Sequence, residues 1–94
     1  MAGTLFVQAP QVLWRDAGSE ILLAPRDRQD VDVLSPTAGA VWRLLGQPVS
    51  EEELVEALAR AFSVPVDAIR ADVSDLLADL HRRRLIDEVA DADD

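Results

Sequence analysis

The sequence has no cysteine and a single histidine, His81, among its 94 residues. The lack of cysteine excludes a disulfide scaffold and a thiolate metal site, and one histidine leaves no histidine pair for zinc. No apolar run approaches the roughly 20 residues that a membrane-spanning helix needs. The first residues also lack the basic segment of a signal peptide. We therefore expect a soluble, cytoplasmic protein that has no membrane anchor and no metal or other cofactor.

Glycine is scarce as well: there are four, and none belongs to a phosphate-binding loop. The acidic run Glu51, Glu52 and Glu53 lies where a helix would begin, and the helix dipole already accounts for acids at that position. His81 has no carboxylate or serine at a spacing that suggests a catalytic triad. The sequence thus shows no pattern of catalytic residues, and we expect a binding protein rather than an enzyme.

Lysine is absent, so all nine basic residues are arginine, against 18 acidic residues and a net charge of −9. Five of the acids lie in residues 87–94, which leaves the first 86 residues with a charge of only −4. We expect residues 87–94 to form a disordered, solvated tail. Residues 1–9 are expected to form an N-terminal arm or a short strand, and residues 10–86 a single domain.

The first half of that domain has the pattern of a sheet. Short apolar segments at residues 11–15, 20–24 and 31–34 are separated by turn-forming and charged residues, which favours three sequential strands in an antiparallel meander. Trp14 in the first segment is expected to point into the core, as is Trp42 further along.

The second half has the pattern of three helices. Ser35 and Pro36 fit the cap and first position of a helix that ends near Gly46, a residue suited to a left-handed C-terminal position. A capping box from Ser50 begins a second helix over residues 50–62. A third, poorly capped helix is expected over residues 65–83, followed by a short returning segment at residues 85–86. The order predicts an α+β, winged-helix-like fold: a three-stranded antiparallel sheet followed by three helices.

A winged helix raises the question of DNA binding, and residues 82–84 are three consecutive arginines. The third helix, however, also carries Asp67, Asp72, Asp75 and Asp79, which would repel phosphates. An edge strand at residues 31–34 beside this helix could instead accept an extended peptide by strand addition. A DNA-binding regulator and a small accessory subunit of an enzyme remain the alternative functions.

The ordered pattern of residues 33–45 (Val-Leu-Ser-Pro-Thr-Ala-Gly-Ala-Val-Trp-Arg-Leu-Leu), residues 71–80 and the pair Leu85 and Ile86 resembles the family of the pyrroloquinoline quinone biosynthesis protein D. Members of this family, called recognition elements, bind the leader segments of ribosomally synthesised, post-translationally modified peptides. The tryptophan after the helix start and the small size are most similar to stand-alone members of lasso-peptide pathways. The chain departs from the family pattern at Arg84, where glycine is usual, and at Val64, where an aspartate usually precedes the proline.

The resemblance implies that a leader peptide adds antiparallel to the third strand, in a groove against the third helix, and that the protein presents it, as a peptide chaperone, to a leader peptidase or a cyclase. Nucleic acid and membranes are not expected partners. A left-handed Arg84 would be mildly strained. The residues implied in peptide binding are Val31, Asp32, Val33 and Leu34 on the strand, and Asp72, Val73, Leu76, Asp79, Leu80 and Arg83 on the helix.

Overall fold

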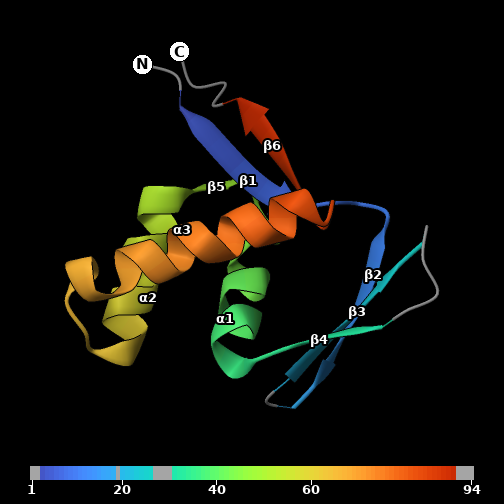
Figure 1. The fold of residues 1–94 in the computed structure, drawn as a ribbon, viewed down its shortest axis with the longest axis horizontal. Helices are drawn as coiled ribbons and strands as arrows, with labels where there is room; N and C mark the ends of the chain where they lie inside the picture. The colour runs from blue at the N-terminus through green and yellow to red at the C-terminus, as the bar shows by residue number, and fades with distance from the viewer. Residues whose placement is uncertain (1–2, 19, 27–30, 91–94) are drawn as a thin grey trace.

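The computed structural model describes residues 3–18, 20–26 and 31–90 of the chain. Within these residues, strands precede, interrupt and follow three helices (Figure 1). In chain order the elements are β1 (Thr4–Gln8), β2 (Val12–Ala17), β3 (Glu20–Pro25), β4 (Asp32–Leu34), α1 (Pro36–Leu44), β5 (Val49–Ser50), α2 (Glu51–Phe62), α3 (Val66–Arg82) and β6 (Ile86–Ala90).

The predicted three-stranded meander is confirmed: β2, β3 and β4 form one antiparallel sheet in that order. The hairpin between β2 and β3 closes at Gly18, whose φ of 83° is a conformation that glycine adopts without strain. The three helices follow β4 as predicted, so the α+β, winged-helix-like class is correct. A second sheet, of order β5–β1–β6, was not predicted, and Figure 1 shows it on a different side of the helices from the first.

The expectation of a disordered tail is wrong for residues 87–90. β6 pairs antiparallel with β1 over five residue pairs, from Thr4 with Ala90 to Gln8 with Ile86. Main-chain pairing with β1 holds this strand, and the Glu88 carboxylate lies 3.1 Å from His81 Nε2 on α3, so the acidic composition that suggested disorder does not prevent strand formation. Residues 91–94 lie outside the described residues.

The first helix begins as expected, because the Ser35 hydroxyl accepts a hydrogen bond from the Ala38 N–H at 3.2 Å and Pro36 occupies the first helical position. The predicted left-handed Gly46 is wrong. The chain leaves α1 through Leu45 at a φ of −77°, and the Gly46 N–H donates to the Arg43 carbonyl oxygen at 3.2 Å. This tightened last turn satisfies the terminal carbonyls without a left-handed residue.

The capping box of α2 is confirmed, since Ser50 and Glu53 exchange both hydrogen bonds, at 3.1 and 3.0 Å. The helix ends at Ser63, which takes the left-handed conformation with a φ of 56°. As expected, α3 starts without a side-chain cap, with Pro65 at its N-terminal boundary. Both helices therefore begin close to where their sequence patterns place them.

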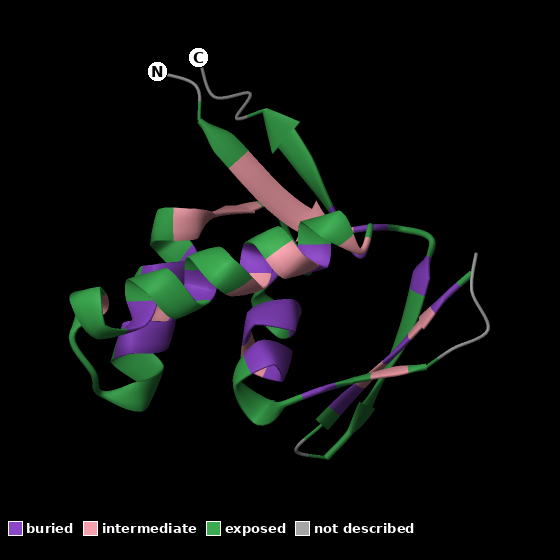
Figure 2. Ribbon diagram, in the orientation of Figure 1, coloured by how far each residue is buried: buried purple, intermediate pink, exposed green. Residues whose placement is uncertain are grey.

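The core lies where the inner faces of the helices meet the two sheets, as the buried segments in Figure 2 show. Trp42 of α1 is fully buried, as predicted. Trp14 also lies on the inner face, because it pairs with the buried Leu23, but it is 41% exposed and so only partly joins the core. Trp14 belongs to an edge strand, and its ring packs edge-on against Trp42 with the two centroids 6.3 Å apart. No helix in the described part of the chain is long and apolar enough to cross a bilayer.

Candidate functional site

The strand β4 forms an open edge of its sheet. Among the residues described, β4 pairs with β3 alone, through Leu34 with Ile21, Val33 with Leu22 and Asp32 with Leu23. The opposite side of β4 therefore has main-chain groups without a strand partner, and such an edge can accept another strand. Val31 precedes the first residue of β4 and is 58% exposed.

The register of β4 determines which way its side chains point. Leu34 lies opposite Ile21, which is fully buried, so Leu34 faces the core. Asp32, two residues away, shares this inner face, whereas Val33 faces the other side and is 55% exposed. Of the predicted strand residues, Asp32 thus points towards the helices.

The helix α3 presents four of the predicted residues along one side. Asp72, Leu76, Asp79 and Arg83 follow one another at intervals of four, three and four residues, so they form a continuous stripe on the helix surface. Asp72 is exposed, and the other three side chains are partly exposed. A guest lying along this side of α3 would meet an aliphatic side chain between charged ones.

Two of the predicted helix residues lie elsewhere. Val73 is 2% exposed and Leu80 is fully buried, so both belong to the core. They hold α3 against the rest of the fold and offer no side-chain surface to a guest. The structure therefore separates them from the stripe that faces outward.

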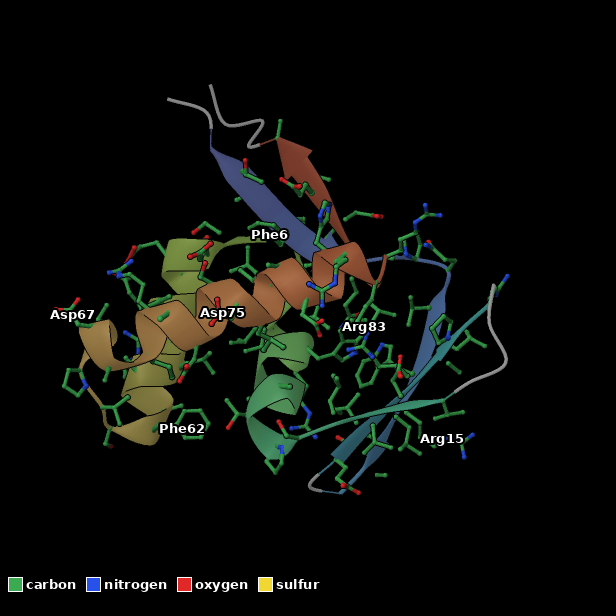
Figure 3. All side chains as sticks on the ribbon, viewed as in Figure 1. Phe6, Arg15, Phe62, Asp67, Asp75 and Arg83 are labelled. Carbon is green, nitrogen blue, oxygen red and sulfur yellow. The ribbon has the colours of Figure 1, made fainter. Side chains whose placement is uncertain are left out.

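Arg83 joins the two halves of the site. Its Nη2 lies 2.8 Å from Asp32 Oδ2 on β4, and its Nη1 donates to Asp79 Oδ2 on α3 at 3.0 Å. Arg83 stands at the end of α3 that is nearer the β2–β3–β4 sheet (Figure 3). Partial burial lowers the pKa of Arg83, but the hydrogen bond to Asp79 and the charge of Asp32 outweigh it and raise the pKa above its ordinary value. This ion cluster fixes the strand edge beside the helix.

The chain turns sharply after this cluster. Arg84, at the position where the family pattern has glycine, adopts a left-handed conformation with a φ of 62°. The turn lets the Leu85 N–H donate to the Leu80 carbonyl oxygen at 3.0 Å and buries the Leu85 side chain completely. The strained residue thus directs the chain from α3 into β6.

Asp32 and Arg83 are both predicted site residues, but their ion pair was not predicted. The i, i+4 spacing of Asp79 and Arg83 was a visible signal for one ion pair. The contact with Asp32 is set by tertiary structure, since it joins residues far apart in the chain. The described residues include no group of three or more His, Asp or Glu side chains arranged to hold a metal ion.

Two solved structures are similar in fold to this chain over most of its length. TbiB1, solved in complex with the TbiA(beta) leader peptide, is 23% identical with a TM-score of 0.77, and the match covers 86% of this chain and 94% of TbiB1. The PqqD truncation of Methylobacterium extorquens PqqCD, solved by solution NMR as a functional and stand-alone recognition element, is 20% identical with a TM-score of 0.71, and the match covers 88% of each chain. A comparison with curated proteins found no match.

At these identities the two structures show a shared fold. The model of one protein family, coenzyme PQQ synthesis protein D (PqqD), matches residues 20–86, from β3 to the start of β6. This match spans more than half of the sequence and includes both elements of the candidate site, and the chain therefore belongs to the PqqD family.

Proposed function

We propose that the protein binds the leader segment of a ribosomally synthesised precursor peptide as an added strand on β4, beside α3. In this function it presents the precursor to a leader peptidase or a cyclase in the cytoplasm. The observation that carries the proposal is the open edge of β4, held beside α3 by the contacts of Arg83 with Asp32 and Asp79. The leader-bound state of the similarly folded TbiB1 supports it. The sequence around Trp42 favours lasso-peptide precursors as the guests.

Main-chain pairing alone would not hold such a guest. Ordering about seven residues costs on the order of 7–14 kcal/mol of backbone entropy. Four or so strand-addition hydrogen bonds return only about 0.5–1.5 kcal/mol each. Two or three large side chains, each hiding roughly 150–250 Å² at about 25 cal/mol per Å², would supply about 4–6 kcal/mol each. We therefore assign most of the affinity to apolar side chains of the leader packed near Leu76.

The charges beside Leu76 would select among leaders. Asp72 is exposed on the same stripe, and Asp79 interacts with both Arg82 and Arg83. A basic leader residue near Asp72 would be attracted, and an acidic one repelled. The acids of α3 also argue against duplex DNA as a guest. Asp72 and Asp75 are exposed along this helix, which would have to enter a DNA groove, and they would repel the phosphates.

The proposal is tested by fluorescence titration with labelled synthetic leaders of candidate precursor peptides. Asp32→Pro removes a strand N–H and the carboxylate that contacts Arg83, whereas Asp32→Asn removes only the negative charge. We expect Asp32→Pro to weaken leader binding more than Asp32→Asn, and circular dichroism to show that both variants fold. Strand addition at β4 is wrong if folded Asp32→Pro binds the leader as tightly as the parent.

A further inference from the structure

Asp32 is the one charged residue of β4, the strand with the open edge. It lies opposite the fully buried Leu23, so its side chain is on the inner face of the sheet, as is that of Leu34. Although it belongs to an edge strand, the Asp32 side chain is only 28% exposed. Any strand that pairs with the open edge of β4 would therefore meet a partly buried carboxylate.

The Asp32 carboxylate has hydrogen-bonding capacity that the fold leaves unused. Its Oδ2 lies 2.8 Å from Arg83 Nη2, and this is its one ion pair with a described residue. An ionised carboxylate offers about four acceptor positions. Asp79, the other carboxylate at Arg83, uses both of its oxygens, one with Arg82 and one with Arg83. Of these two acids, Asp32 is the one that can still accept a hydrogen bond from a guest.

The charges around Asp32 favour a basic guest side chain. Asp32 and Asp79 share the guanidinium group of Arg83. The second arginine of the cluster, Arg82, is 74% exposed, so water screens its charge strongly. A third carboxylate brought to this edge would be repelled by two acids that already share one partly buried cation. An ammonium or guanidinium group would instead be attracted to Asp32.

Strand addition would bring one guest side chain directly against Asp32. In the antiparallel pairing that the family resemblance implies for a leader, the residue opposite Asp32 projects from the same face of the sheet, with the two Cβ atoms about 4.5–5.5 Å apart. The leader residue two positions earlier would lie opposite Leu34, which is 5% exposed, and would face the same way. The inner side of the leader would thus meet an aliphatic side chain first and a carboxylate second.

We propose that Asp32 is a specificity-determining residue, which selects leaders that carry an apolar residue and, two positions later, a lysine or arginine. This inference rests on the proposed leader binding at β4. Main-chain pairing accepts any sequence, whereas the Asp32 carboxylate distinguishes side chains at one position. Arg83 acts as a positioning residue, because it holds this carboxylate on the inner face beside α3.

The test uses the full chain and the synthetic leader that binds it most tightly in fluorescence titration. Each leader residue is replaced in turn by Lys and by Glu, and both affinities are measured for the parent, Asp32→Asn and Asp87→Asn. Asp32→Asn removes the charge and keeps the shape of the side chain. Asp87→Asn is the matched control, because Asp87 is an exposed acid on β6, which lies on a different side of the helices (Figure 1).

In the parent we expect one leader position at which Lys binds about tenfold more tightly than Glu, with an apolar residue required two positions earlier. In Asp32→Asn this preference should fall to about twofold, and in Asp87→Asn it should stay near tenfold. The preference exerted by Asp72 should lie at another leader position and survive Asp32→Asn. The comparison of Lys and Glu leaders in the parent needs no protein variant, so it holds even if Asp32→Asn folds poorly.

Two results would overturn the role of Asp32: equal affinity of Lys and Glu leaders at every position in the parent, or charge preferences that all persist in folded Asp32→Asn. An apolar requirement two positions after the basic residue would overturn the antiparallel order. If no leader binds the parent in the first titration, the proposed function itself fails.

Discussion

Arg83 contacts both the strand and the helix of the candidate site through one guanidinium group. Its side chain is 30% exposed, so its ion pairs with Asp32 and Asp79 are only partly screened by water. Removing the positive charge would leave these two carboxylates close to each other without their shared counter-charge. Arg83 therefore contributes to stability and also holds β4 in position beside α3.

We expect Arg83→Gln to lower the free energy of unfolding by about 1–2 kcal/mol and to weaken leader binding. Urea denaturation measures the first effect and fluorescence titration the second. Arg82→Gln is the control, because Arg82 is 74% exposed and pairs with Asp79 alone among the described residues. Equal stability losses in the two variants would show that the contact with Asp32 has no special role.

Arg84 is a second residue whose backbone conformation matters. Left-handed backbone costs an ordinary residue roughly 1–2 kcal/mol, and glycine adopts it without strain. We expect Arg84→Gly to raise the free energy of unfolding by about 0.5–1 kcal/mol, after allowing for the greater freedom of glycine in the unfolded chain. Ser63, with a φ of 56°, offers a second test by the same substitution. A loss of stability in urea denaturation would contradict the strain argument.

At the scale of the element, α3 serves two purposes on two sides. Ile69, Val73, Leu77 and Leu80 are buried against the core, and the stripe from Asp72 to Arg83 runs beside them. Leu76 lies between these sides, because it is partly buried and packs on the core. A substitution there acts on both folding and binding.

We expect Leu76→Asp to abolish leader binding, and Leu76→Ala to weaken it about tenfold. The alanine variant separates the two effects better, because a carboxylate against the core also destabilises the fold. Leader titration is paired with a urea denaturation curve for each variant. Ser74→Ala, on an exposed part of the same helix, should leave both measurements unchanged. Leader binding by folded Leu76→Ala at the parent's affinity would remove Leu76 from the site.

The strand β6 was not predicted, because the acidic composition of residues 87–94 suggested disorder. We expect a chain that ends at Ile86 to lose about 1–3 kcal/mol of stability, because the hydrogen bonds between β6 and β1 are lost. A chain that ends at Ala90 keeps all five residue pairs and should unfold like the full chain. Thermal and urea denaturation distinguish the two truncations. Equal stability of both shortened chains would mean that the β1–β6 pairing contributes nothing.

For the whole molecule, local patterns predicted more than long-range pairings. The helices are specified by residues close together in the sequence, such as the caps Ser35 and Ser50 and the regularly spaced apolar residues. The structure has these helices close to their predicted positions. The sheet formed by β1, β5 and β6 joins segments from the start, middle and end of the chain, and no local pattern specifies such pairing. The Arg83–Asp32 pair was missed for the same reason. The family resemblance also implied Val73 and Leu80 as groove residues, and both are buried, because a family pattern does not show which part of a helix face the rest of this chain covers.

The distribution of charge over the whole molecule gives a further prediction. With a net charge of −9 and exposed acids along α3, the protein should not bind duplex DNA even at low salt. An electrophoretic mobility shift titration with random-sequence duplex measures this directly. Salt-sensitive duplex binding would instead favour the regulator considered from the sequence.

The pairing of Thr4 with Ala90 has a consequence for modular architecture. It brings the first and last strands of the described chain together, on a different side of the helices from the β2–β3–β4 sheet (Figure 1). A fusion partner attached through a linker at either terminus would emerge from this shared corner and leave the open edge of β4 unobstructed. The same recognition unit could therefore operate alone or as a covalent appendage of a larger enzyme without redesign of its binding surface.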